Sequence, residues 1–214
     1  MTEMKQYPLP DIHFVPSTVI LANGDFPSHP LSLAWLDACP FVVCCDGAAD
    51  AYIASGRIPA AIVGDGDSLS PKIKEKYASI VYSETEQDTN DLNKAFRFCL
   101  SQGRKEVVIL GATGKREDHT LGNISLLVDF MNQAQVMMLT DYGVFIPIHG
   151  DASFQSCPEG HVSIFNMGCT SLSAEGLVYP LSVFTNWWQG TLNVAKGDNF
   201  VIRTDGNILV FREY

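Results

Sequence analysis

Four short acidic motifs lie between residues 45 and 119, each beside an apolar run or at the start of a helical pattern. Several carboxylates gathered in one place repel one another unless a cation offsets their charge. Hard oxygen ligands of this kind suit Mg²⁺, which usually bridges protein carboxylates to phosphates. The motifs therefore predict a Mg²⁺–nucleotide site. Solvated aspartates are the alternative, but helix capping explains one or two of them rather than all. The motifs are Cys45-Asp46-Gly47, Gly64-Asp65-Gly66-Asp67-Ser68, Asp88-Thr89-Asn90-Asp91 and Arg116-Glu117-Asp118-His119.

The second motif comes directly after an apolar run at 61–63, so its carboxylates should emerge at the end of a strand. Glycines at positions 64 and 66 let the backbone turn sharply and approach a ligand closely. Asp65 and Asp67, one residue apart, can converge on a single cation from such a turn. The alternative is an Asp-Gly turn in which Ser68 caps a helix that begins at Pro71.

The third motif lies where a helix is predicted to begin. A carboxylate at a helix start is favoured by the macrodipole whatever its function, and this explains Asp91 equally well. Asp88 lies outside the helix, so capping accounts for it less well. Lys94 follows Asp91 by three residues on nearly the same face, and it would contact either a phosphate or Asp91 itself.

The fourth motif ends a stretch that runs from the apolar Leu110 through a glycine-rich loop into a helix. Free N–H groups at such a helix start form an anion cradle, although the spacing is not that of a P-loop. Arg116 offers a fork of donors for phosphate oxygens. His119 is either a base or a group that orients its neighbours, and Asn123 projects from the same helix face.

The elements that must position these residues alternate between short β-branched strands and helices from Thr18 to Thr140. This alternation is typical of an α/β fold with a mostly parallel, Rossmann-like sheet and helices on both faces. The carboxyl ends of the strands then meet at one edge, where ligands bind. We expect strands at 19–22, 41–45, 60–63, 80–82, 107–110 and 136–139, and helices at 50–55, 71–77, 91–102 and 118–132.

The helical periodicity ends after Ile146. Short apolar runs follow at 162–165, 171–174, 190–194, 200–203 and 208–211, and Thr204-Asp205-Gly206-Asn207 carries a hairpin turn signal. We therefore expect an α/β domain over residues 1–147 and an antiparallel β-sandwich domain over residues 148–214. So small a β unit exposes edges and a limited core, which favours packing against another subunit.

The composition, with 46% hydrophobic and 18% charged residues, is that of a globular chain. A net charge of −10 argues against nucleic acid as a partner, whereas a nucleotide can arrive with its own Mg²⁺. The six cysteines form no CxxC pair, so we expect reduced thiols in a cytoplasmic protein. The polar N-terminus and the absence of a long apolar run predict neither a signal peptide nor a membrane span.

In their order and spacing the four motifs resemble those of the thiamine pyrophosphokinase family. The family pattern has Asp-Gly, then Gly-Asp-x-Asp-Ser, then Asp-x-Thr-Asp with a downstream Lys-Ala, then Gly-Gly-Arg-x-Asp-His-x-x-x-Asn. Similar segments at 21–24, 175–181 and 190–193 extend the resemblance over nearly the whole chain. Three positions depart from it: Asn90 replaces a Thr, Lys115 replaces the second Gly of the loop, and Leu192 replaces a Ser near the expected thiamine site.

The resemblance implies transfer of the diphosphoryl group of ATP to the hydroxyl of thiamine, giving thiamine diphosphate and AMP with Mg²⁺ as cofactor. It also implies a homodimer whose active site is shared between the α/β domain of one subunit and the β domain of the other. Two alternatives stay open. One is a Mg²⁺-dependent phosphohydrolase acting on a small phosphorylated metabolite, and the other is a non-catalytic sensor of thiamine or a nucleotide.

The resemblance also assigns roles to residues. Thiamine is a flat cation, which suits an aromatic face in a negative cleft. Trp187 and Trp188 are either additional aromatics of that cleft or core and interface side chains. The catalytic set is Asp46, Asp65, Asp67, Asp88, Asp91, Arg116 and Asp118, of which Asp65, Asp67, Asp88 and Asp91 hold the metal. The ATP side comprises Asn23, Ser68, Lys94, His119 and Asn123, and the thiamine side comprises Tyr179, Thr191 and Asn193.

Overall fold

The computed structural model describes residues 4–214, and its contacts divide the chain into two compact units. One unit is Ile12–Asp141, and the other combines the residues up to Asp11 with Tyr142–Tyr214. We expected the boundary near residue 147, but it falls between Asp141 and Tyr142. The reason is that the strands β1 (Lys5–Tyr7) and β8 (Val144–His149) both pair within the second unit.

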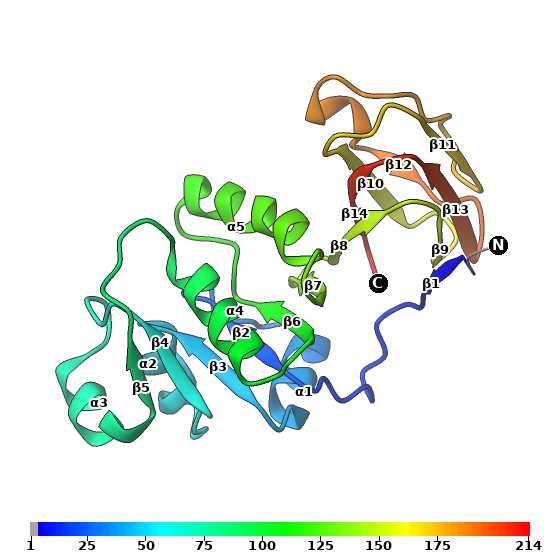
Figure 1. Cartoon of the computed structure of the whole chain (residues 1–214). Coiled ribbons are helices and arrows are strands. Elements are labelled where there is room, and N and C mark those ends of the chain that lie inside the picture. The colour runs from blue at the N-terminus through cyan, green and yellow to red at the C-terminus, as the bar shows by residue number, and fades with distance from the viewer. Residues whose placement is uncertain (1–3) are drawn as a thin grey trace. The chain divides into compact units, whose positions relative to one another are not determined.

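The first unit contains a parallel sheet with the strand order β7-β6-β2-β3-β4-β5 (Figure 1). Its central strands are buried on both faces, as expected for a parallel sheet that helices cover. The strands are β2 (Val19–Leu21), β3 (Val42–Cys45), β4 (Ala61–Gly64), β5 (Val81–Ser83), β6 (Glu106–Leu110) and β7 (Gln135–Leu139).

Helices cover both faces of this sheet. Figure 1 shows α4 and α5 on one face and α1 and α2 on the other. Helix α4 turns its buried residues Leu92, Ala95, Phe96 and Cys99 toward β2, β3 and β4. The helices are α1 (Pro30–Ala38), α2 (Ala48–Ala54), α3 (Pro71–Lys76), α4 (Asp91–Ser101) and α5 (Glu117–Phe130), with a 3₁₀ turn η1 (Ala78–Ile80).

Helix α1 is an element that the sequence did not lead us to expect. It begins at Pro30, a residue that is favourable at the first helical position, and His29 Nδ1 accepts a hydrogen bond from the Leu31 N–H at 3.3 Å. Trp35 and Leu36 are buried, so the helix is fixed by packing.

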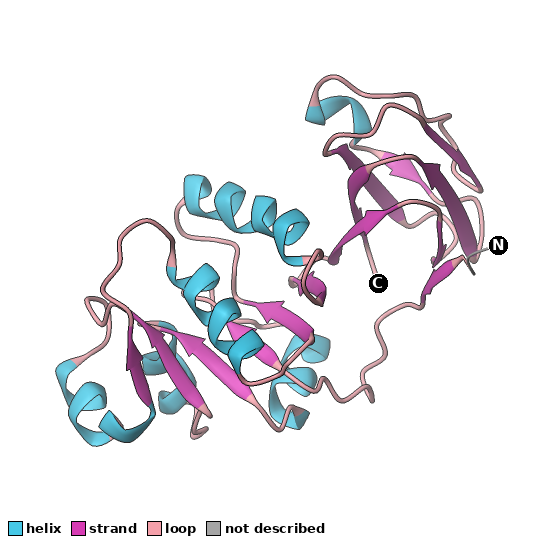
Figure 2. Ribbon diagram, viewed as in Figure 1, coloured by secondary structure: helices cyan, strands magenta, loops and turns pink. Residues whose placement is uncertain are grey.

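The second unit is a β-sandwich of two four-stranded layers, with the orders β1-β9-β13-β11 and β12-β10-β14-β8 (Figure 2). The pairs are antiparallel except for β1 with β9, which is parallel. Its further elements are β9 (Ala152–Gln155), β10 (His161–Asn166), β11 (Leu172–Glu175), η2 (Trp187–Gly190), β12 (Asn193–Val194), β13 (Asn199–Thr204) and β14 (Asn207–Arg212).

The expected fold class, α/β with an antiparallel β-sandwich, is therefore confirmed. One expected strand, at 190–194, is wrong in its first half, because the 3₁₀ turn η2 ends at Gly190 and only Asn193–Val194 forms a strand. The Asn186 side chain and Gln189 cap this turn reciprocally, which explains why the chain coils there.

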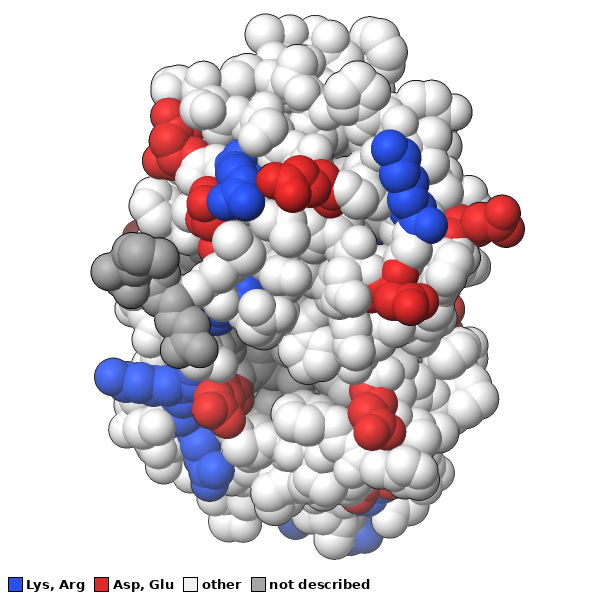
Figure 3. All heavy atoms as spheres, turned by 90° about the vertical axis from the view of Figure 1, so that its right-hand side faces the viewer, with Lys and Arg blue, Asp and Glu red and all other residues white. Residues whose placement is uncertain are grey.

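Charged side chains on the face shown in Figure 3 are scattered, and several basic groups lie directly beside acidic ones. Along residues 4–214, no helix combines the length and the apolar character that a membrane crossing requires.

Candidate active site at the carboxyl edge of the parallel sheet

Two adjacent strands bring the first two acidic motifs together. Strands β3 and β4 pair in parallel with Cys45 opposite Val63, so both chains leave the sheet at the same edge. Asp46 is the first residue after β3, and its N–H donates to the Val63 carbonyl at 2.9 Å. Asp65 is the first residue after β4. Their juxtaposition therefore follows from parallel pairing, as the sequence predicted.

A third carboxylate comes from α4. Asp91 is the first residue of this helix, which packs on β3 and β4. One carboxylate oxygen each from Asp46, Asp65 and Asp91 lies within 4.8 Å of the others. Three hard oxygen donors at this spacing are suited to a divalent cation such as Mg²⁺.

Gly64 makes this close approach of Asp46 and Asp91 sterically feasible. A Cβ atom at position 64 would lie 2.8 Å from Asp46 Cβ and 3.1 Å from Asp91 Oδ1. Since a real Cβ does not tolerate the shorter contact, a larger residue would push one carboxylate away. The glycine is needed here for space rather than for an unusual backbone angle.

The three carboxylates differ in their protonation tendencies. Burial raises the pKa of Asp46, and the charges of Asp91 and Asp65 raise it further against the lowering effect of the Ser68 N–H. Burial likewise raises the pKa of Asp91, although the Lys94 ammonium opposes this shift. The Asp67 N–H and the Gln87 side chain lower the pKa of Asp65. Negative charge is thus costly at Asp46 and Asp91, and a cation beside these two carboxylates would be favoured.

Asp46 also supplies an unsatisfied oxygen. Only 1% of the residue is exposed, its Oδ2 accepts from the Ser68 N–H at 2.8 Å, and its Oδ1 is buried without a hydrogen-bond partner in the described part of the chain. A buried polar atom without a partner is rare and often marks a ligand site. The donor set and this free oxygen therefore fit Mg²⁺, with Asp46 as a ligand candidate that our metal set had omitted.

Lys94 is buried beside the cluster. It is 1% exposed, and its Nζ lies 3.4 Å from Asp91 Oδ1. We expected Lys94 to contact either a phosphate or Asp91, and the structure shows the contact with Asp91. Three carboxylates and one ammonium leave a formal charge of 1 − 3 = −2 in this group when all are ionised. A divalent cation would balance that charge.

Three other residues of the acidic motifs lie around this group. The Asp67 and Ser68 N–H groups donate to Asp65 Oδ1 at 3.0 Å and to Asp46 Oδ2 at 2.8 Å, so the turn orients both carboxylates. Ser68 acts here through its backbone. The Asp88 N–H donates to Glu86 Oε2 at 2.8 Å. The three-carboxylate group of the described residues thus contains neither Asp67 nor Asp88, which we had expected among the metal ligands.

A second group of loops lies at the ends of β2 and β6, where the strand order of the sheet reverses. The Gly24 N–H donates to the Gly111 carbonyl at 2.7 Å, so the two loops run side by side. Lys115 Nζ donates to Asn23 O at 3.0 Å and to Asn23 Oδ1 at 3.1 Å. Such a reversal point is where open α/β sheets bind nucleotides.

Lys115 adopts a conformation that favours glycine. Its φ of 56° is left-handed, at the position where the family pattern has its second Gly. The loop conformation is therefore compatible with the expected pattern even though the residue type departs from it.

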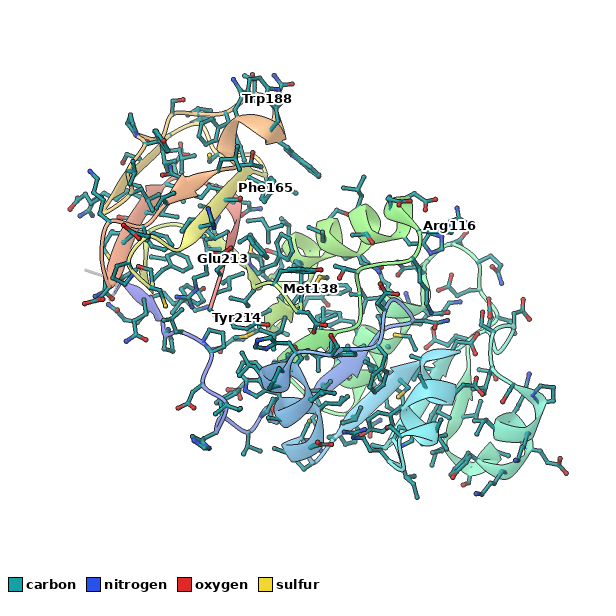
Figure 4. All side chains as sticks on the ribbon, turned by 180° about the vertical axis from the view of Figure 1, so that it is seen from behind. Arg116, Met138, Phe165, Trp188, Glu213 and Tyr214 are labelled. Carbon is teal, nitrogen blue, oxygen red and sulfur yellow. The ribbon has the colours of Figure 1, made fainter. Side chains whose placement is uncertain are left out.

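Arg116 lies at the start of α5 (Figure 4). Its Nε and Nη2 donate to the two Asp118 oxygens at 3.1 and 2.6 Å, and Asp118 Oδ1 also accepts from the His119 N–H at 3.0 Å. The Arg116 guanidinium lowers the pKa of Asp118 to about 2. Asp118 thus orients Arg116 and His119 here, and it lies outside the three-carboxylate group.

Asn123 connects the two groups of loops. Its Nδ2 donates to the Ala112 carbonyl at 2.9 Å, and its Oδ1 accepts from Asn90 Nδ2 at 3.1 Å. Asn90 in turn caps α4 by accepting from the Asn93 N–H at 3.0 Å. The glycine-rich loop and the start of α4 are thereby joined through one amide side chain.

The expected thiamine-side residues lie together in the sandwich. Asn193 Oδ1 accepts from the Tyr179 N–H at 3.1 Å, and Asn193 Nδ2 donates to the Tyr179 carbonyl at 2.9 Å. Tyr179 is 59% exposed, whereas Asn193 is buried. Thr191 Oγ1 donates to the Trp188 carbonyl at 2.8 Å, and Trp188 projects from η2 (Figure 4). Asn193 therefore fixes the Tyr179 backbone rather than facing a ligand.

An Arg97–Glu86 network beside the third motif was missed from the sequence. The available signal was the two glutamates that precede the motif, Glu84 and Glu86, with Arg97 two turns into the following helix. Asn93 and Arg97 are four residues apart, so they share a face of α4.

An open parallel sheet with acidic and glycine-rich loops at its carboxyl edge is the architecture of a nucleotide-binding α/β domain. A family model described as the catalytic domain of thiamin pyrophosphokinase matches residues 33–139, and one described as its substrate-binding domain matches residues 143–211. Thiamine pyrophosphokinase 1 of Oryza sativa subsp. japonica is 31% identical over 173 residues, which cover 71% of this chain. The chain therefore belongs to the thiamin pyrophosphokinase family.

The matched region spans 64% of the length of that rice relative. Two solved structures have a similar fold. Thiamin pyrophosphokinase from Candida albicans matches with a TM-score of 0.78 and 17% identity, over 98% of this chain and 92% of the other. Yeast thiamin pyrophosphokinase matches with a TM-score of 0.74 and 18% identity, over 98% and 90% of the two chains. At these identities the likeness establishes the fold.

Proposed function

We propose that the chain is a thiamine diphosphokinase, which transfers the diphosphoryl group of ATP to the hydroxyl of thiamine and releases AMP. The observation that carries the proposal is that carboxylate oxygens of Asp46, Asp65 and Asp91 lie within 4.8 Å of one another, at a helix start that Asn123 links to the glycine-rich loop. Family membership supplies the choice of substrates, and the geometry supplies a site where a metal–triphosphate can bind.

The carboxylates Asp46, Asp65 and Asp91 would hold Mg²⁺, with Asp67 and Asp88 close to the triphosphate. When bound, Mg²⁺ neutralises phosphate charge as it develops in the transition state. The buried Oδ1 of Asp46 fits this role because it lacks another partner among residues 4–214. Asp67 and Asp88 lie outside the three-carboxylate group of the described residues, so we place them at the triphosphate and not on the metal.

The cations of the site would act on the phosphate oxygens. The Arg116 side chain is 71% exposed and held by Asp118, so its remaining donors face outward. Lys94 would stabilise Asp91 and the β-phosphate region, and Asn23, Ser68, His119 and Asn123 would shape the ATP side through their loop contacts. Because phosphoryl transfer demands little covalent chemistry from the protein, positioning and electrostatic stabilisation account for most of the expected rate enhancement.

Thiamine would bind against the sandwich, with Tyr179 stacking on the cationic ring and Thr191 and Asn193 supporting that segment. The exposed apolar side chains at 178, 179, 183, 187, 188 and 192 support a partner for this surface. We therefore propose a homodimer in which thiamine lies between the sandwich of one subunit and the α/β unit of the other. We also place the reaction in the cytoplasm.

Complementation tests the shared site. At thiamine concentrations well below the wild-type KM, Tyr179→Ala and Asp65→Asn chains should each be poorly active, but mixing them should restore one intact site in each heterodimer. If heterodimers form and no activity returns, the site is not shared between subunits.

The reaction itself is tested by incubating the protein with ATP, Mg²⁺ and thiamine and separating the nucleotides. Diphosphoryl transfer requires AMP to appear in step with thiamine diphosphate and only when thiamine is present. A phosphohydrolase would instead release phosphate without thiamine, and a sensor would bind the ligands without turnover. Either result would reject the proposal.

A further inference from the structure

The loop between β5 and α4, residues 84–90, carries Asp88 and leads directly into Asp91. We propose that Glu86 and Arg97 form a positioning pair that holds this loop against α4, so that both aspartates face the metal–triphosphate site. The inference deepens the proposed function and rests on it. Neither residue belongs to the acidic and glycine-rich motifs described above.

Glu86 folds back onto its own loop. Its Oε2 accepts from the Asp88 N–H at 2.8 Å and from the Thr89 N–H at 3.1 Å, and its Oε1 accepts from the Thr89 hydroxyl. One carboxylate therefore fixes the backbone on both sides of the peptide that joins Asp88 to Thr89. Replacement of Glu86 by a residue without a carboxylate would release the backbone that positions the Asp88 side chain.

Arg97 ties this folded loop to the helix. Its Nη2 donates to Glu84 Oε2 at 2.7 Å and to Glu86 Oε1 at 2.8 Å. Its Nη1 donates to Thr89 Oγ1 at 3.0 Å and to Asn93 Oδ1 at 3.2 Å. A planar guanidinium can serve four acceptors in this way, whereas a lysine ammonium cannot match the fork geometry.

The two ends of the loop are anchored at the candidate site. The Glu84 N–H donates to the Gly64 carbonyl at 2.9 Å, next to Asp65. At the other end Asn90 caps α4 and contacts Asn123. Between these anchors, the described hydrogen bonds that shape the loop all pass through Glu86 or Arg97, apart from the Gln87 contact with Asp65.

Removal of the Glu86–Arg97 pair is expected to lower activity more than it lowers folding stability. The Arg97 side chain is 41% exposed and those of Glu84 and Glu86 are 37% and 36% exposed, and exposed ion pairs add little to folding stability. A misplacement of about 1 Å in a catalytic group, by contrast, can lower turnover on the order of 100-fold. Loss of the Glu86–Arg97 pair should therefore affect the position of the loop, and with it turnover, more than it affects folding stability.

The test compares Arg97→Met with Arg57→Met. Arg57 lies in the same unit and makes a similar surface network, donating from Nε to Asp37 and from Nη1 to Ser55, each at 2.5 Å. Both variants should unfold at similar temperatures. Only Arg97→Met should lower kcat, by roughly 10- to 100-fold, and raise the Mg²⁺ concentration needed for half-maximal rate.

Amide hydrogen exchange gives a readout that does not depend on turnover. The Asp88 and Thr89 N–H groups should exchange faster in Arg97→Met and in Glu86→Ala than in the wild type, and remain protected in Arg57→Met. Because the pair acts as a unit, the Glu86→Ala, Arg97→Met double variant should lose little more activity than either single variant. Arg97→Lys should recover only part of the lost rate.

The proposal is overturned if Arg97→Met lowers kcat no more than Arg57→Met, if the two single losses multiply in the double variant, or if exchange at Asp88 and Thr89 is unchanged. A failure of the proposed function looks different, because the wild type itself would then form no thiamine diphosphate. The exchange measurement would still decide whether Glu86 and Arg97 fix the loop.

Discussion

Asp46 and Ser68 are joined by a hydrogen bond that leaves half of a buried carboxylate free. The Ser68 N–H binds Asp46 Oδ2 at 2.8 Å, while Oδ1 has no hydrogen-bond partner within the described chain. The turn after β4 thus holds the side chain that follows β3, and this side chain belongs to the three-carboxylate group with Asp65 and Asp91. The arrangement is unfavourable for the isolated protein and favourable once a cation is bound.

Asp46→Asn is therefore expected to raise thermal stability without metal and to weaken the response to Mg²⁺ with a non-hydrolysable ATP analogue. With the ligand at 100 times its dissociation constant, the free energy of unfolding of the wild type should rise by about 2.7 kcal/mol. For a chain of this size that rise corresponds to a melting temperature roughly 5–10 °C higher. Thermal melts with and without the ligand measure both effects. Asp129→Asn, which removes the same charge from an exposed position on α5, should keep the full shift. An unchanged shift in Asp46→Asn would contradict the metal assignment.

Gly64→Ala tests whether space at the end of β4 limits the site. The added Cβ would meet Asp46 Cβ at 2.8 Å and Asp91 Oδ1 at 3.1 Å, so the carboxylates must separate. We expect turnover to fall at least 10-fold and stability to fall by about 1–3 kcal/mol, as is usual for overpacking. Activity assays and urea denaturation check these two effects.

Gly122→Ala is the matched control for that substitution. A Cβ at this position in α5 meets no atom within 4 Å, so alanine should stabilise the helix by about 1 kcal/mol and leave turnover unchanged. Normal activity in Gly64→Ala would mean that the close approach of Asp46 and Asp91 is not required.

The sequence predicted the parallel sheet and the edge where the acidic motifs meet, because strand ends and motifs are local patterns. It did not predict β1, whose partner β9 lies far along the chain, so that only pairing defines the strand. It did not predict β8 either, since Pro147 within Val144–His149 argues against a strand. Long-range pairing therefore explains the misplaced domain boundary.

The sequence likewise predicted one part of the candidate site and not the rest. Asp46 and Asp65 meet because β3 and β4 pair in parallel, which the alternation of elements implied. The selection of Asp46 over Asp67 and Asp88 depends on turn geometry that residue spacing does not contain. The partners of Arg97 depend on side-chain directions for the same reason.

Tyr179→Ala tests the proposed thiamine side. The ring is exposed while its backbone is held by Asn193, so truncation should change recognition more than folding. A desolvated aromatic–cation contact is worth about 1–2 kcal/mol, so the KM for thiamine should rise roughly 5- to 30-fold with little change for ATP. Tyr77→Ala, which removes a tyrosine from the α/β unit, should leave the KM for thiamine unchanged. Equal changes for both substrates in Tyr179→Ala would argue against stacking.

Asp205 should make the sandwich sensitive to acid. Its Oδ1 accepts from the Thr170 and Ser171 N–H groups at 2.8 and 2.9 Å, and its Oδ2 accepts from the Thr170 hydroxyl at 2.5 Å. The Thr170 side chain and these N–H groups lower the pKa of Asp205 from 3.8 to about 2. Because the folded chain holds the proton less tightly than the unfolded chain, this contribution to stability is present above about pH 4 and is lost as the pH falls toward 2.

Asp205→Asn is thus expected to unfold at a lower urea concentration than the wild type at pH 6, with the difference shrinking between pH 4 and pH 2. Thr170→Val removes one donor, so the pKa of Asp205 should rise toward its ordinary value and the acid sensitivity should appear at a higher pH. Urea denaturation of the three proteins across this pH range measures both shifts. A difference between wild type and Asp205→Asn that stays constant from pH 6 to pH 2 would show that the carboxylate charge does not stabilise the loop.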